Sequence, residues 1–249
     1  ITNSILMKSK YKFLVVYKKQ KKIFGHKFLF TRPFKFFIPL FTDCQYFSSN
    51  KPDASINHFP TLYSNLLKKV DVSFSSKHKY YFPENPEITN FFSDYFDKFI
   101  NDKYLLIHLD EKWLDIPEVN IKLTSQISNL QKNLNYSLIL TSYNNKFDYY
   151  NNLKKNFTTI NFVNDKINFN NYKNHNKIII LENMSLSLLE KFISKSILTV
   201  SCHSGYMVHI CGTNFTHYVD IINKHVSDWA DCWVPKNTKY SRIYKTDLP

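Results

Sequence analysis

The sequence predicts an α/β fold whose C-terminal part is a parallel β-sheet covered by helices on both faces. Short apolar segments alternate with helical patterns through residues 104–222. This alternation favours a parallel sheet, because two parallel strands need a crossover connection between them. Such sheets bind ligands at the carboxyl ends of their strands. Polar clusters follow three of the expected strands, at residues 108–113, 141–146 and 202–205.

Composition and charge indicate a folded chain with an anionic partner. The 249 residues are 43% hydrophobic and 17% aromatic, enough for one large domain or two small ones. The net charge of +13 favours a nucleic acid, an anionic membrane surface or a phosphorylated substrate. The sequence contains no zinc-finger spacing and no RNA-binding aromatic motif, so a nucleic acid is not the expected partner.

Cysteine usage and hydropathy favour a cytoplasmic location. The four cysteines form neither a CxxC pair nor a disulfide framework, so no structural metal is expected and a reducing compartment fits. No apolar segment approaches the roughly 20 residues that a membrane-spanning helix needs. We expect a cytoplasmic protein whose positive charge favours peripheral contact with the anionic inner face of a membrane.

The first 100 residues are expected to form a short or truncated N-terminal α/β domain. Residues 11–17 and 27–30 are predicted strands, and apolar residues recur at helical spacing in 56–70 and 88–100. The densest basic segment, residues 18–22, is interpreted as a solvated loop between two strands, with contact to a polyanion as the alternative. Because the chain begins with Ile1 rather than Met, we expect that part of this domain is missing.

From residue 104 the predicted elements follow one another regularly. Helix 119–134 has one apolar face, Ser187 and Glu190 have capping-box spacing in helix 185–194, and the Asn-rich residues 164–176 are a predicted surface loop. The strands are predicted at 104–109, 136–141, 158–163, 177–181, 197–201 and 217–222, and the helices at 119–134, 146–155, 185–194 and from 205 onward.

The segment 197–212 is the strongest candidate for a binding site. It reads as a strand, a turn and a helix, and contains Gly205 and Gly212, two of the three glycines in the chain. Glycine is used where backbone geometry or a close neighbour excludes a side chain, so Gly205→Val is expected to disrupt the turn and binding together. A turn that opens a helix directs N–H groups at one point, which favours a phosphate. The same pattern also fits an ordinary joint between a strand and a helix.

Further candidates follow the other strands. Lys112 can neutralise a phosphate as a point charge, and Asp110 and Glu111 can serve as acids, bases or metal ligands. The alternative for these residues is a charged surface loop in which Trp113 packs on the sheet. Met184 either fills the core or covers a flat ring.

Three segments together resemble the ADP-heptose:lipopolysaccharide heptosyltransferases, glycosyltransferases of family 9 with a GT-B fold. The likeness lies in a Met-Ser-Leu helix start, a Ser-Gly turn followed by a helical His, and an acidic-Lys-Trp loop. It covers residues 104–225, and His203 stands where the family has an acidic residue. The matching residues are Asp110, Glu111, Lys112, Trp113, Met184, Ser185, Leu186, Ser204, Gly205 and His209.

The resemblance implies an enzyme of GT-B type with a partial acceptor-side domain in residues 1–100 and a nucleotide-sugar-binding, Rossmann-type domain in residues 101–249. It implies inverting transfer of a hexose or heptose from a nucleotide-diphosphate sugar to a glycan or glycolipid. Such reactions belong to bacterial lipopolysaccharide or cell-envelope glycan synthesis. The nucleotide sugar is a co-substrate, and neither cofactor nor metal is implied.

The resemblance also implies residue roles. Lys112 and the turn of Ser204 and Gly205 would hold the diphosphate, and Met184 would lie near the nucleobase. The full set of donor-binding candidates is Lys112, Met184, His203, Ser204, Gly205 and His209, with Asp110, Glu111 and Ser142 as further candidates.

The catalytic residue stays unidentified at this stage. The family's general base is an acidic residue just after the first strand of the N-terminal domain, but the first acidic residue here is Asp43. A chain without that base would bind donor and turn over poorly. The alternative function is therefore a non-catalytic module that binds a nucleotide or a polyanion, and a third hypothesis is nucleic-acid binding.

Overall fold

The computed structural model describes residues 13–23, 26–31, 43–48, 61, 86, 90 and 103–248, the last range without 135, 144, 164–165, 168–176 and 236–237. The chain divides into two compact units, Ile1–Lys77 with His225–Val234, and His78–Lys224 with Pro235–Pro249. The domain boundary predicted at residue 100 and most of the helices predicted at 56–70 and 88–100 lie outside the described residues.

The first unit contains a three-stranded sheet in the order β2-β1-β3. β1 (Phe13–Ile23) pairs antiparallel with β2 (His26–Thr31) and parallel with β3 (Asp43–Ser48). Both strands predicted here are confirmed, whereas β3 was not predicted. The interpretation of residues 18–22 as a loop is wrong, because these residues continue β1 and pair with β2. The short elements η3 (Lys224–Val226) and α9 (Ser227–Asp231) occur later in the chain.

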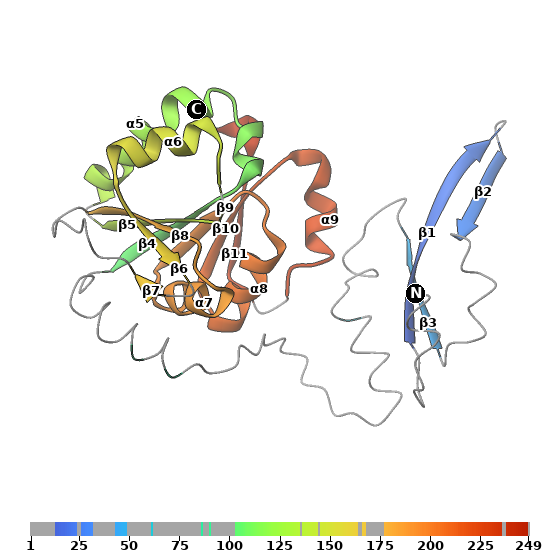
Figure 1. Cartoon of the computed structure of the whole chain (residues 1–249). Coiled ribbons are helices and arrows are strands. Elements are labelled where there is room, and N and C mark those ends of the chain that lie inside the picture. The colour runs from blue at the N-terminus through green and yellow to red at the C-terminus, as the bar shows by residue number, and fades with distance from the viewer. Residues whose placement is uncertain are drawn as a thin grey trace. The chain divides into compact units, whose positions relative to one another are not determined.

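The second unit is built on a sheet of eight strands in the order β11-β10-β9-β4-β5-β8-β6-β7 (Figure 1). Seven of these strands are parallel, which confirms the predicted α/β fold of Rossmann-like type, and β7 (Lys166–Ile167) pairs antiparallel with β6. The parallel strands are β4 (Tyr104–Leu109), β5 (Ser137–Ser142), β6 (Thr158–Val163), β8 (Ile178–Glu182), β9 (Leu198–Ser201), β10 (His217–Ile222) and β11 (Tyr240–Tyr244).

Helices cover both faces of this sheet (Figure 1). α5 (Val119–Leu134) and α6 (Asp148–Asn156) lie on one face, and α7 (Leu186–Lys195) and α8 (Gly205–Asn214) lie on the other. The predicted apolar face of α5 is buried at Val119, Leu123 and Ile127, all of which belong to the core on that side of the sheet. Among the described residues, no helix has the length and apolar character that crossing a membrane requires.

Three sequence predictions for this unit were wrong or incomplete. Ser185, rather than Ser187, is the N-cap of α7, and its side chain accepts a hydrogen bond from the Leu188 N–H at 3.1 Å. Ser187 and Glu190 therefore lie inside the helix and form no capping box. The predicted loop 164–176 contains β7, and β11 was not predicted.

The order of the strands creates a switch point at β4. This strand lies between β5 and β9, so the chain leaves β4 toward one edge of the sheet and leaves β9 toward the other. The loops that follow β4 and β9 consequently diverge, and in open parallel sheets such a point is where a ligand crevice forms. The three polar clusters predicted from the sequence follow β4, β5 and β9, at this edge of the sheet.

Candidate functional site

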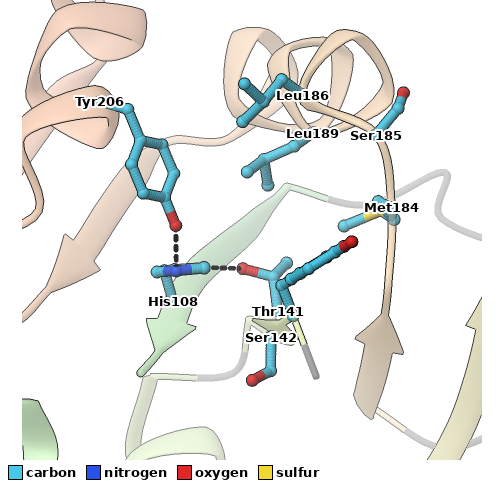
Figure 2. A pocket seen from close by; sticks show the side chains of 9 residues that line it. His108, Thr141, Ser142, Met184, Ser185, Leu186, Leu189 and Tyr206 are labelled. Carbon is cyan, nitrogen blue, oxygen red and sulfur yellow. Dashed lines mark hydrogen bonds between the residues drawn. The ribbon is translucent and has the colours of Figure 1, made fainter. Parts of the chain in front are cut away.

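Two neighbouring cavities occupy the edge of the sheet around the switch point. A polar cavity of about 560 Å³ is lined by the loop after β4 and by the start of α8, including Lys112, Ser204 and Gly205. An apolar cavity of about 500 Å³ is lined by Met184 and the first turns of α7 (Figure 2). Three side chains line both cavities and mark their junction: His108, Tyr143 and Tyr206.

Lys112 connects the two loops that diverge at the switch point. It lies in the short helix η2 (Glu111–Asp115), and its Nζ donates to the His203 carbonyl oxygen at 2.8 Å. The Lys112 side chain is 40% exposed, so its charge can meet a ligand in the polar cavity. The ammonium of Lys112 therefore holds the two loops together and offers a positive charge to the cavity.

The position of Lys112 is fixed by its neighbours. The Asp110 side chain caps η2 by accepting from the Lys112 N–H at 3.1 Å, and burial raises the pKa of Asp110 while the Lys112 charge opposes that shift. Lys245, in η4 (Lys245–Asp247), donates from Nζ to the Lys112 carbonyl oxygen at 2.6 Å and to Asp115 Oδ2 at 2.9 Å. The hydrogen bond to Lys245 lowers the pKa of Asp115. The Asp110 cap and the hydrogen bonds from Lys245 therefore fix the position of η2.

The turn after β9 has a backbone that few side chains tolerate. His203 has φ of 43°, in the left-handed region that non-glycine residues rarely adopt. Buried Asp220 stabilises this conformation, since its carboxylate accepts from the His203 N–H at 2.8 Å and lies 3.0 Å from His203 Nδ1. Tyr240 also donates to Asp220, at 2.7 Å. The His203 ring is therefore turned toward β10, and only its main-chain carbonyl reaches Lys112.

The N-terminus of α8 is open toward the polar cavity. Ser204 is its N-cap, yet the Ser204 side chain makes no capping hydrogen bond, whereas side chains cap both η2 and α7. The first N–H groups of a helix have no partner within the helix and carry partial positive charge. Together with Lys112 they form the positive part of a cavity lining that also includes the carboxylates of Asp110 and Glu111.

The surroundings of Gly205 and Gly212 differ, so different features explain the two glycines. A Cβ built on Gly212 would lie 2.4 Å from Thr238 Oγ1, so close packing excludes a side chain there. A Cβ on Gly205 would meet nothing within 4 Å, and Gly205 lines the polar cavity. The expectation that the turn itself needs Gly205 is therefore wrong. A side chain at position 205 would instead enter the polar cavity, where a ligand can bind.

This difference gives a prediction for two matched variants. Gly205→Ala should keep or slightly raise the free energy of unfolding, while a phosphate-bearing ligand should lose about 1–3 kcal/mol of binding free energy because the methyl group enters its space. Gly212→Ala, the control in the same helix, should instead lower the melting temperature through overpacking against Thr238. Thermal melts and calorimetric titrations measure both effects. A Gly205→Ala variant that unfolds more easily than Gly212→Ala would contradict this assignment.

The remaining predicted site residues separate into two groups. Met184 lines the apolar cavity at 8% exposure, Asp110 and Glu111 line the polar cavity, and Ser142 lines the apolar one while its hydroxyl donates to the Leu109 carbonyl at 2.8 Å. His209 lies one turn into α8 and lines neither cavity. Within the described residues there is no group of three His, Cys, Asp or Glu side chains that could hold a metal ion.

Sequence reasoning included His108 in the polar cluster 108–113 without giving it a role and did not single out Tyr206, although both line the junction. A short hydrogen bond joins the Tyr206 hydroxyl to His108 Nε2, and His108 Nδ1 lies 3.0 Å from Thr141 Oγ1 (Figure 2). Burial, reinforced by the Lys112 charge, lowers the pKa of His108 to about 4. The ring is therefore neutral near pH 7. An aromatic residue directly after Gly205 was the one available sequence signal.

The fold defines a Rossmann-like α/β protein with two neighbouring cavities at its switch point. No family model matches the chain, and no curated protein matches it either. The function must therefore be argued from the residues of the two cavities.

Proposed function

We propose that this chain binds a nucleotide-diphosphate sugar in the two cavities at the switch point. The observation that carries the proposal is that Lys112 and the uncapped N-terminus of α8 line a polar cavity which adjoins an apolar cavity containing Met184. A diphosphate suits the polar cavity and a flat nucleobase suits the apolar one. The polar and apolar linings of the paired cavities therefore suit the two ends of one ligand.

We infer further that the chain is a glycosyltransferase of GT-B type, which transfers the sugar with inversion to a glycan or glycolipid acceptor. The resemblance of residues 104–225 to the heptosyltransferases supports this reaction. The cation of Lys112 and the N–H groups of α8 would stabilise the negative charge that develops on the leaving diphosphate, an electrostatic contribution to the transition state. The acceptor, the sugar and the general base remain to be assigned by experiment.

A non-catalytic nucleotide-binding module is the alternative function. The observation that favours it is that the matching residues in the two cavities, Lys112, Met184, Ser204 and Gly205, are assigned to binding by the resemblance and none to proton transfer. Such a module would keep the two cavities and bind the same diphosphate ligand. The two functions therefore differ in turnover and not in binding.

Thermal melts with a panel of nucleoside diphosphates, followed by transfer assays with nucleotide sugars, test the proposal. A ligand at about 100 times its dissociation constant should add about 2.7 kcal/mol to the stability, which raises the melting temperature by several degrees. The matching nucleoside should give a smaller shift. Stabilisation without transfer to any acceptor would favour the binding module. Binding to an RNA or DNA duplex that weakens steeply with salt, without any response to nucleotides, would favour the nucleic-acid hypothesis.

A further inference from the structure

His108, Thr141 and Tyr206 form a hydrogen-bonded chain that ends at the junction of the two cavities. The three side chains come from β4, β5 and α8, and Figure 2 shows the Tyr206 hydroxyl directed at the His108 ring, with Thr141 on the far side of that ring. Thr141 and His108 are 1% and 4% exposed, whereas Tyr206 is 39% exposed. The chain therefore runs from two buried side chains to a partly exposed one, and all three line the apolar cavity.

The direction of this chain depends on where the proton of the Thr141 hydroxyl is donated. Among the described residues, His108 Nδ1 is the only hydrogen-bond partner of the Thr141 hydroxyl. A buried hydroxyl has one proton to donate, and leaving it without an acceptor costs free energy. When Thr141 donates to Nδ1, this nitrogen carries its lone pair.

The direction of the Thr141 hydrogen bond determines the direction of the hydrogen bond between His108 and Tyr206. A neutral imidazole whose Nδ1 accepts carries its proton on Nε2, so His108 donates from Nε2 to the Tyr206 oxygen. The Tyr206 proton then needs another acceptor. Burial raises the pKa of Tyr206 to about 12 against a smaller opposing hydrogen bond from Ser204, so the proton is retained at neutral pH. Tyr206 lines both cavities, and its hydroxyl has a proton to offer there.

We propose that the Tyr206 hydroxyl donates a hydrogen bond to the phosphate that is attached directly to the nucleoside. His108 and Thr141 are positioning residues, because their hydrogen bonds leave the Tyr206 proton free for this contact. This inference rests on the proposed function. The junction lies between the polar cavity and the apolar one, which is where the first phosphate of a nucleoside diphosphate would meet the nucleoside. A donor held in one direction favours an anionic oxygen at this point over a group that must itself donate.

Calorimetric titrations of Tyr206→Phe test the ligand contact. Because the lost hydrogen bond is to a charged group, the affinity for nucleoside diphosphates should fall about tenfold or more. The affinity for the matching nucleosides, which lack the phosphate, should fall less than about twofold. Tyr136→Phe is the control, because Tyr136 is exposed and lines neither cavity, and it should keep the wild-type affinities. Equal losses for nucleoside and nucleoside diphosphate would overturn the phosphate contact.

The ¹⁵N spectrum of the His108 ring tests the direction of the chain without any ligand. The wild type should show a protonated Nε2 and a lone pair on Nδ1. Thr141→Val should disturb this state and weaken nucleoside diphosphate binding, and Thr141→Ser, which restores the hydroxyl, should rescue both. A wild-type ring protonated on Nδ1 would overturn the positioning roles. A wild type that binds no nucleoside diphosphate would instead overturn the proposed function, and the two failures are therefore distinguishable.

Discussion

Lys112→Met should lower the affinity for nucleoside diphosphates about ten- to hundredfold. The substitution keeps the aliphatic stem but removes the cation that lines the polar cavity, and a hydrogen bond to a charged group contributes about 1.5–3 kcal/mol. The bond from Lys112 Nζ to the His203 carbonyl is lost as well, so the loops after β4 and β9 lose one connection. Isothermal titration calorimetry measures the affinity, and circular dichroism measures whether the fold is kept.

A matched control separates a local contact from the overall charge. Lys146 follows β5 at the same edge of the sheet, is exposed and lines neither cavity, so Lys146→Met changes the net charge by the same amount. It should bind nucleoside diphosphates as the wild type does. If Lys146→Met weakened binding as much as Lys112→Met, long-range attraction by the basic chain would explain the affinity, and Lys112 would have no special role.

The local sequence was sufficient for the residues that lie on regular elements and in the loops directly after them. Lys112, Ser204 and Gly205 were predicted to meet because parallel strands bring their carboxyl ends to one edge, and the structure places all three along the polar cavity. For Met184 the local sequence left a core position and the cover of a flat ring as alternatives, and only the resemblance assigned it to the nucleobase. These predictions required the period of the pattern and the direction of the strands, both of which are local properties.

Contacts that depend on the order of the strands were not predictable. His108 and Tyr206 are 98 residues apart and meet because β9 lies beside β4, which nothing in the spacing of the chain specifies. The different roles of Gly205 and Gly212 likewise depend on Thr238, a neighbour from a distant segment. β11, an edge strand, was missed because its sequence, YSRIY, neither forms an apolar run nor alternates between polar and apolar residues.

The buried neutral state of His108 should make the stability of this chain depend strongly on pH. The pKa of His108 is about 4 in the native state against an ordinary value of 6.5, mainly because burial disfavours the charged ring. Between these two values the unfolded chain binds a proton that the native chain does not bind, so the free energy of unfolding falls as the pH falls. Each tenfold difference in proton affinity corresponds to about 1.4 kcal/mol. His108 should therefore account for a loss of about 2 kcal/mol between pH 7.5 and pH 5.

Urea unfolding at these two pH values, followed by tryptophan fluorescence, measures the effect in the wild type and in His108→Gln. The variant lacks the titrating ring, so its free energy of unfolding should fall by about 2 kcal/mol less than that of the wild type over the same interval. His225→Gln, at an exposed histidine, controls for the loss of one histidine from the chain. Equal slopes in the wild type and His108→Gln would mean that His108 is protonated in the native state near its ordinary pKa. A charged ring would donate from both nitrogens, and Thr141 would then accept rather than donate, so this experiment also bears on the direction of the chain that ends at Tyr206.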